Sequence, residues 1–200
     1  MRPRLEQERE YRREMIINAT ERLLKEKDFE SITMEDIAGV SDFCKASIYQ
    51  YFKNKEELIL AVFARIMDAE YALIEEKCSS QTDPVQAIRN YICLEFEFFY
   101  QRPWSAKIIL NFPFRDFHPE NSSLPLKYAQ KKKLIAAIIQ RGQREGKFIT
   151  ADTQALTNMI LTISKGFATY LSAVFTADIK SPEIEMFISM IIKGITKEAQ

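Results

Sequence analysis

Apolar residues recur along the chain at spacings of three and four, which is the period of an α-helix with one buried face. Ile16, Ala19 and Leu23 form such a stripe in the first charged segment, and Leu58 and Val62 belong to another. No segment alternates apolar and polar residues as a half-buried strand would, and no internal repeat interrupts the pattern. The pattern therefore predicts an all-α fold.

Capping and helix-breaking residues divide this pattern into separate helices. Thr33, Asn54 and Asp83 carry side chains that cap helix starts, and Gly146 is suited to end a helix. The predicted helices cover approximately residues 4–27, 34–40, 44–52, 55–77, 84–100, 103–110, 126–145, a segment from Thr150 or Asp152 to 176, and 182 to near the end. Residues 112–125 are expected to form a loop.

The stretch from residue 33 to residue 52, TMEDIAGVSDFCKASIYQYF, predicts two short helices joined by a tight turn. Thr33, with Asp36 three residues later, forms a capping-box signal at the start of the first helix. In the second helix, Ile48 and Phe52 are four residues apart and are expected to face inward. Two short helices in this order are typical of a helix-turn-helix.

The second of these helices keeps a set of small and polar side chains for its start and its open side: Lys45, Ala46, Ser47, Tyr49, Gln50 and Tyr51. Small residues let a helix start approach a groove, while a lysine and hydroxyl groups reach phosphate oxygens and Ser or Gln hydrogen-bonds base edges. The set favours DNA as a partner. Packing against the first and fourth helices is the alternative for Tyr49 and Tyr51.

A longer segment around this stretch carries a recognisable series of residues. The series is Ala19, Leu23, Phe29, Ile32, Thr33, Met34, Ile37, Ala38, Ile48–Phe52 and Lys53–Leu58, without a gap. Residues from about 16 to 63 thus resemble the DNA-binding domain of the TetR (tetracycline repressor) family of one-component transcriptional regulators. In register, Asp42, Phe43 and Cys44 replace the family's Gly-Val-Ser turn, and the similar Gly39-Val40-Ser41 lies three residues too early. Asp adopts a left-handed backbone less readily than Gly, and Cys is a poor cap.

The resemblance implies a division into an N-terminal three-helix helix-turn-helix DNA-binding domain, residues 1–53, and a larger C-terminal helical ligand-binding and dimerisation domain, residues 54–200. It also implies a homodimer on a palindromic double-stranded operator, released by a small-molecule effector. By position, the phosphate contacts fall to Thr33, Tyr49, Gln50, Tyr51 and Lys55. The base-edge contacts fall to Met34, Lys45, Ala46 and Ser47.

The last two predicted helices carry more apolar surface than the exterior of a monomer should expose. TetR-like regulators dimerise through their last two helices, so the resemblance implies an interface there. The expected interface residues are Phe167, Leu171, Phe187, Ile188, Ile191 and Ile195. An ordinary internal core is the alternative.

Aromatic residues are unusually dense between residues 93 and 128, around a segment with little helical character. Such a concentration suits a mainly apolar cavity with a few polar groups that orient a ligand. The expected lining is Phe96, Phe99, Tyr100, Trp104, Phe117, His118, Phe167 and Tyr170. We expect an apolar or aromatic small molecule and not a metal ion or nucleotide, although a plain helical core could absorb any one of these rings.

Composition narrows the class of protein without itself indicating nucleic acid. The 200 residues are 46% hydrophobic with a formal net charge of +0, so DNA binding must come from local placement of cations. The first residues lack the apolar region of a signal peptide, and the apolar run 156–175 is broken by Lys165, which predicts a cytoplasmic protein without a membrane span. Cys44, Cys78 and Cys93 are odd in number and lack C-x-x-C spacing, which fits reduced thiols, with a redox switch at Cys44 as the lesser alternative.

Motifs that would indicate an enzyme are missing from the sequence. It has no Gly-rich phosphate loop, no Ser-x-Gly elbow and no HExxH, and one histidine cannot supply a histidine-based metal cluster. We therefore expect no enzymatic activity and no cofactor. The competing hypothesis is a helical adaptor or ligand-sequestering protein without specific DNA binding.

Overall fold

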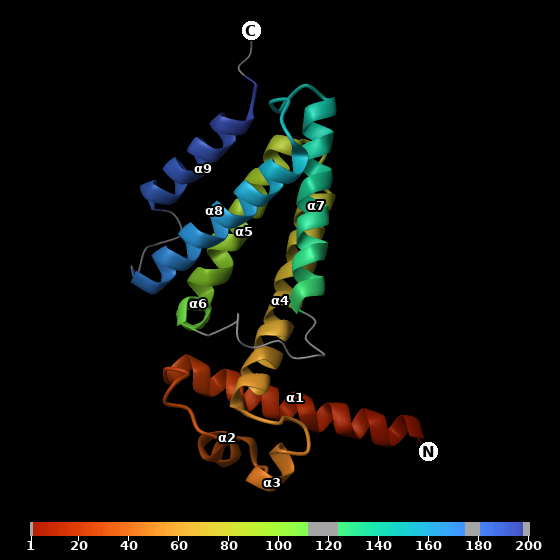
Figure 1. The fold of residues 1–200 in the computed structure, drawn as a ribbon, viewed down its shortest axis with the longest axis vertical. Coiled ribbons are helices and arrows are strands. Elements are labelled where there is room, and N and C mark those ends of the chain that lie inside the picture. The colour runs from red at the N-terminus through yellow and green to blue at the C-terminus, as the bar shows by residue number, and fades with distance from the viewer. Residues whose placement is uncertain (1, 112–123, 175–180, 198–200) are drawn as a thin grey trace. The chain divides into compact units, whose positions relative to one another are not determined.

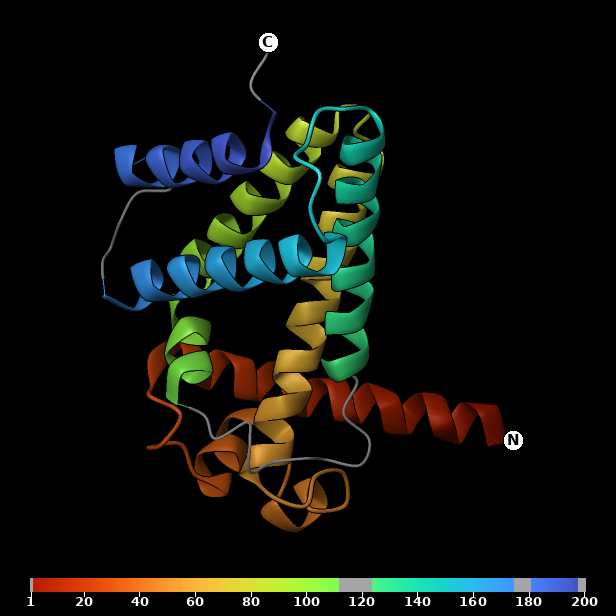
Figure 2. The same ribbon diagram turned by 45° about the horizontal axis from the view of Figure 1, so that its top comes forward.

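The computed structural model describes residues 2–111, 124–174 and 181–197, which form helices joined by short connections (Figures 1 and 2). The helices are α1 (Arg2–Glu26), α2 (Met34–Ser41), α3 (Lys45–Ile48), α4 (Lys55–Ser79), α5 (Pro84–Gln101), α6 (Pro103–Asn111), α7 (Leu124–Arg144), α8 (Thr153–Val174) and α9 (Pro182–Ile195). In these ranges there is no β-strand, only an isolated bridge between Phe148 and Thr196. No helix of the described part is long and apolar enough to cross a bilayer. The all-α prediction is confirmed.

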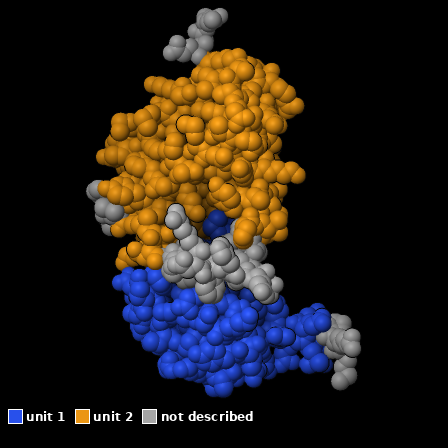
Figure 3. Space-filling model, viewed as in Figure 1, with its two compact units in different colours: residues 1–67, 112–124 blue, residues 68–111, 125–200 orange. Residues whose placement is uncertain are grey.

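The chain packs as two units, coloured separately in Figure 3. Among the described residues, the first unit contains 2–67, that is α1, α2, α3 and the first half of α4, together with Leu124, the first residue of α7. The second unit contains the rest of α4 and the helices α5 to α9. Helix α4 therefore contributes to both units, with the change at Met67. The predicted division into a DNA-binding domain, residues 1–53, and a ligand-binding and dimerisation domain, residues 54–200, stays a prediction.

Two predicted caps fix the helices of the first unit. The Thr33 hydroxyl accepts a hydrogen bond from the Asp36 amide at 3.1 Å, and the Thr33 amide donates to the Asp36 carboxylate at 2.9 Å, which completes the capping box. At the start of α4, Asn54 Oδ1 accepts from the Glu57 amide at 2.8 Å. The Glu57 carboxylate in turn accepts a hydrogen bond from the Lys53 amide at 2.6 Å. Both helix starts are thus satisfied by local side chains.

The caps of the second unit also follow the sequence. Asp83 Oδ1 accepts from the Val85 amide at 3.2 Å, with Pro84 at the first helical position. Of the two proposed caps for α8, Asp152 makes the bond, accepting from the Ala155 amide at 2.7 Å. Gly146, with φ +72°, follows α7 in a conformation that side chains disfavour. These local signals place the helix boundaries.

The core of the first unit joins one face of each helix. The predicted stripe Ile16, Ala19 and Leu23 is buried in α1, and Ile48 and Phe52 are 0% and 1% exposed. The other buried apolar residues of this unit are Ile17, Leu24, Ile32, Met34, Ile37, Leu58, Ile59, Leu60, Val62, Phe63 and Ile66. Full burial of an aliphatic or aromatic side chain contributes about 1.5–3 kcal/mol, so these contacts hold the short helices α2 and α3 in place.

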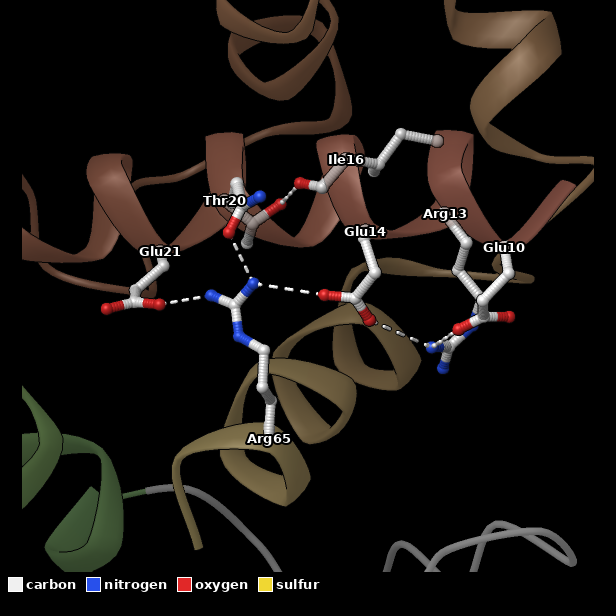
Figure 4. Close-up of polar contacts among 8 residues, drawn as sticks. Glu10, Arg13, Glu14, Ile16, Thr20, Glu21 and Arg65 are labelled. Carbon is white, nitrogen blue, oxygen red and sulfur yellow. Dashed lines mark hydrogen bonds and ion pairs between the residues drawn. The ribbon is translucent and has the colours of Figure 1, made fainter. Parts of the chain in front are cut away.

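A polar clamp joins α4 to α1 beside this core (Figure 4). The Arg65 guanidinium of α4 points toward α1, where it forms ion pairs with Glu21 and, at 3.3 Å, with Glu14. It also donates to the Asn18 side chain. The Arg65 side chain is 28% exposed, so the planar guanidinium is partly shielded from solvent and engages three partners at once.

The core of the second unit gathers around α5. Phe96 of α5 lies edge-on to Phe167 of α8 and to Phe187 of α9, with ring centroids 5.8 and 5.5 Å apart. Phe167 and Phe187 stack on each other at 4.4 Å. Aromatic contacts of this geometry add to the burial of apolar area. The three rings therefore tie α5, α8 and α9 together.

A buried group of charges lies in the same unit and joins α4, α5 and α7. Lys131 Nζ donates to Glu95 Oε1 at 2.5 Å and to Glu70 Oε1 at 3.2 Å, and Tyr91 donates to Glu95 Oε1 at 2.8 Å. Glu95, Lys131 and Glu70 are 1%, 3% and 5% exposed. Burial and the neighbouring Glu95 raise the pKa of Glu70 to about 7. Burial disfavours the charged lysine, but the two carboxylates outweigh it and raise the pKa of Lys131 above its ordinary value.

Candidate nucleic-acid interface

In the turn between α2 and α3, Asp42 has a left-handed backbone conformation, as expected for the residue that replaces the family's turn glycine. This residue ends α2 in the left-handed region, with φ 61° and ψ 18°. Arg22 of α1 donates to the Val40 carbonyl at 3.0 Å and so secures the last turn of α2. An aspartate accepts this conformation where a bulkier residue would be strained. The helix-turn-helix is therefore formed without the family's turn glycine.

Helix α3 is shorter than the predicted segment 44–52. It spans Lys45–Ile48 and is followed by a turn in which the Tyr51 and Phe52 amides donate to the Ile48 carbonyl at 2.9 and 3.0 Å. The side chain of Cys44 makes no capping bond to the backbone. It contacts the Ser47 hydroxyl at 3.0 Å instead, and this hydrogen bond lowers the pKa of the thiol. The expectation that Cys44 is a poor cap is thus met.

Most of the predicted DNA-contacting side chains of this segment are accessible. Lys45, Ala46, Tyr49 and Gln50 are exposed, Tyr49 by 47%, whereas Ser47 and Tyr51 are half-buried. Their exposure follows from the anchoring of Ile48 and Phe52 in the core, which turns the remaining side chains outward.

Lys45 is joined to Glu35 near the start of α2 by an ion pair. The hydrogen bond between them lowers the pKa of Glu35 and raises that of Lys45, so both side chains are charged at neutral pH.

Three other residues predicted to contact DNA already have partners or are buried. The Thr33 hydroxyl is occupied by the capping box. Met34 is 7% exposed and contributes to the core of the first unit. Lys55 Nζ donates to the Phe29 and Glu30 carbonyls at 3.0 and 3.2 Å and holds the connection between α1 and α2. Their roles toward DNA stay predictions.

The structure adds two arginines that the sequence analysis did not single out. Arg9 and Arg12 of α1 line an open hollow of about 400 Å³ together with Gln50 and Tyr51. The Arg9 guanidinium lies 6.0 Å from the centre of the Tyr51 ring, and Arg12 pairs with Glu8 at 2.6 Å. Their spacing of three places both on one helix face, but only the fold brings that face to the turn after α3.

The residues predicted to line an effector cavity lie at different depths. Phe96 and Phe99 are buried, Trp104 and Phe167 are half-buried, and Tyr100 and Tyr170 are each 50% exposed. The predicted residues Phe117 and His118 lie outside the described ranges. Several side-chain atoms of this unit are buried without a hydrogen-bond partner, among them Trp104 Nε1, Ser164 Oγ and Thr169 Oγ1.

The residues predicted to form the dimer interface are largely covered within one chain. Phe187, Ile188 and Ile195 are buried, while Phe167, Leu171 and Ile191 are half-buried. Other apolar side chains of the same helices are more exposed: Met159 (56%) and Ile163 (44%) on α8, and Met186 (69%) and Met190 (65%) on α9. The most exposed apolar side chains of α8 and α9 are thus not the ones predicted for the interface, and the predicted interface stays a prediction.

Comparisons with known proteins agree with this geometry. Residues 16–62 match the family model described as bacterial regulatory proteins, tetR family. The HTH-type transcriptional repressor KstR2 of Mycolicibacterium smegmatis is 21% identical over 68% of this chain and 67% of its own length.

Two solved structures share the fold over most of the chain. A TetR transcription regulator from Haloarcula marismortui has a TM-score of 0.77 at 20% identity, covering 94% of this chain and 100% of its own. The transcriptional regulator FadR from Bacillus subtilis, solved in complex with stearoyl-CoA, has a TM-score of 0.69 at 19% identity, covering 90% and 95%. Residues 16–62 thus match the tetR family model, and the fold over most of the chain is that of solved TetR regulators.

Proposed function

We propose that the protein is a repressor that binds a palindromic operator as a homodimer in the cytoplasm and is released by a small molecule. The observation that carries the proposal is the exposed set Lys45, Ala46, Tyr49 and Gln50, which lies on α3 and in the turn after it, while Ile48 and Phe52 anchor the same segment in the core. A rigid helix with outward polar side chains can enter a major groove, where Lys45 reaches base edges and Tyr49 reaches phosphate. Arg9 and Arg12 supply further cations at the end of the same surface.

Dimerisation is proposed to use the outer faces of α8 and α9. Met159, Ile163, Met186 and Met190 present large apolar side chains to solvent, and a second copy of the chain would cover them. Two-fold symmetry would then place two α3 helices about 34–36 Å apart, as successive major grooves require. This assignment keeps the helices of the predicted interface and changes the face.

The effector is proposed to be a mainly apolar molecule bound within the second unit. The B. subtilis FadR structure was solved with stearoyl-CoA, so this fold has a precedent for a ligand that carries a long acyl chain. The buried, unpaired Trp104 Nε1, Ser164 Oγ and Thr169 Oγ1 are candidates for hydrogen bonds to the polar part of such a ligand. A ligand that favours the conformer with weak DNA affinity relieves repression, and DNA must weaken the ligand by the same factor.

DNA contact is tested first by selecting bound fragments from random DNA and measuring the affinity of two variants at fixed salt. Tyr49→Phe removes one hydrogen bond to a DNA phosphate. It is expected to lower the affinity for every DNA sequence about three- to tenfold. Lys45→Ala is expected to lower affinity and also to change the preferred sequence. Unchanged affinity and preference in both variants would contradict this assignment. Failure of the wild type to enrich any DNA would favour the adaptor hypothesis.

Effector binding is tested by a ligand screen with two readouts. Trp104 is the only tryptophan, so its fluorescence reports on the second unit, and release of the selected operator reports on function. We expect ligands that change Trp104 emission to lower operator affinity, and operator DNA to lower ligand affinity by an equal factor. Ligands that change Trp104 emission but leave operator affinity unaltered would show that the site does not control DNA binding.

A further inference from the structure

An acidic side chain stands beside the DNA-reading helix where cations would be expected. Glu35 lies in the first turn of α2 and is paired with Lys45, the first residue of α3 and ten positions further along the chain. The side chains of Glu35 and Lys45 are 66% and 46% exposed, so the pair lies on the surface. It brings a carboxylate within reach of whatever Lys45 contacts.

The fold does not require this carboxylate. Asp36 completes the capping box of α2, and Glu35 is too exposed to pack against the core. A carboxylate near DNA is repelled by phosphates, and exposed ion pairs contribute little to stability. The needs of the fold therefore account for little of its position, and the surface pair with Lys45 is the feature to be explained.

We propose that Glu35 is a specificity-determining residue that accepts a hydrogen bond from the amino group of a cytosine in each operator half-site. The inference rests on the proposed function, because it requires α3 to enter the major groove. Cytosine N4 is the donor that a glutamate reads there, and guanine O6 and N7 are acceptors for a lysine. Since Glu35 and Lys45 touch each other, they are placed to read the same or adjacent G·C pairs.

The Glu35–Lys45 pair can distinguish DNA sequences in two ways. It contacts the cognate base pair, and it lowers the affinity for other sequences. On a cognate site, Lys45 moves from Glu35 to guanine while the cytosine amino group replaces it as the donor to Glu35. On other sequences, Lys45 is drawn to phosphate or guanine and leaves the carboxylate without a donor, close to the phosphates. Glu35 therefore weakens binding to non-cognate DNA more than binding to the operator.

The experiment compares motifs enriched from random DNA by the full-length wild type, Glu35→Ala and Glu35→Gln, followed by affinities at fixed salt. Glu35→Ala is expected to lose about tenfold in preference for cytosine at one position of each half-site while gaining affinity for unrelated DNA. Glu35→Gln is expected to move the preference at that position toward adenine, which an amide recognises. A merely structural role would change affinity for all sequences and leave the motif alone.

Glu76→Ala is the matched control. Glu76 lies near the end of α4, its side chain is 69% exposed, and it pairs with Lys77 at 3.3 Å, so its removal changes net charge by the same amount. We expect the wild-type motif from this variant. Wild-type motifs from both Glu35 variants, folded as judged by circular dichroism, would overturn the inference and leave the proposed function standing. A wild type that enriches no motif would overturn both.

Discussion

Lys131→Met is expected to lower the free energy of unfolding by about 3–5 kcal/mol, the cost of leaving buried charges without their partner. Lys131 stands between Glu70 and Glu95, and none of the three is more than 5% exposed. Methionine has a similar length, so the substitution removes the cation without a large cavity. Urea unfolding followed by circular dichroism measures the loss as a lower midpoint at unchanged slope.

Two comparisons separate the effect of charge from the effect of packing. Lys133→Met changes an exposed lysine of the same helix and is expected to alter stability by no more than about 0.5 kcal/mol. Replacing Glu70 and Glu95 by Gln together with Lys131→Met is expected to recover much of the loss, since no buried charge remains. A loss that persists in the triple variant, or is equal for Lys133, would assign the effect to packing.

The loss in free energy of unfolding caused by Lys131→Met should depend on pH. Burial, followed by repulsion from Glu95, raises the pKa of Glu70 from its ordinary 4.5 to about 7 in the folded protein, and loss of the cation raises it further. A carboxyl whose pKa is higher when folded contributes stability at low pH that is lost as pH rises above 4.5. The variant is therefore expected to be closer to wild type at pH 5 than at pH 8.

Met186→Glu combined with Met190→Glu is expected to give a folded monomer that no longer binds a two-half-site operator. Both methionines lie on the outer face of α9, 69% and 65% exposed, so each carboxylate stays solvated in a single chain. In the proposed dimer, the same carboxylates would be buried without partners. Analytical ultracentrifugation measures the oligomeric state, and binding of a full operator and a half-site measures the functional loss.

Leu126→Glu serves as the control for this prediction. It places the same charge on α7, at a leucine that is 61% exposed, and is expected to leave both the dimer and DNA binding intact. Phe187→Glu should behave differently from both, since this buried ring packs on Phe96 and its loss should unfold the second unit. An unaltered dimer in the Met186 and Met190 variant would place the interface elsewhere.

The helices are predictable because their signals are local. Thr33, Asn54 and Asp83 bond to amides two or three residues ahead, so the sequence alone locates these helix starts. The length of α3 is harder to predict from the sequence. The spacing between Ile48 and Phe52 fits a continuous helix, but it equally fits the turn that the structure contains there.

Long-range features could not be predicted in the same way. Lys131 begins a run of three lysines, which is typical of a solvated face, and it is buried only because carboxylates 36 and 61 residues away surround it. The contact of Glu35 with Lys45 depends on the angle of the turn between α2 and α3. On α9, an apolar composition did not distinguish the inner Phe187 from the outer Met186.

The ion pairs of Arg65 make the contact between α4 and α1 in the first unit sensitive to ionic strength. Because Arg65 of α4 contacts Glu14, Asn18 and Glu21 of α1, a movement of α4 is expected to move α1 with it. These pairs are only partly buried, so added salt screens them and loosens the contact. Under the proposed function, added salt acts at two places: it competes with the protein at the DNA phosphates, and it screens the ion pairs that hold α4 against α1.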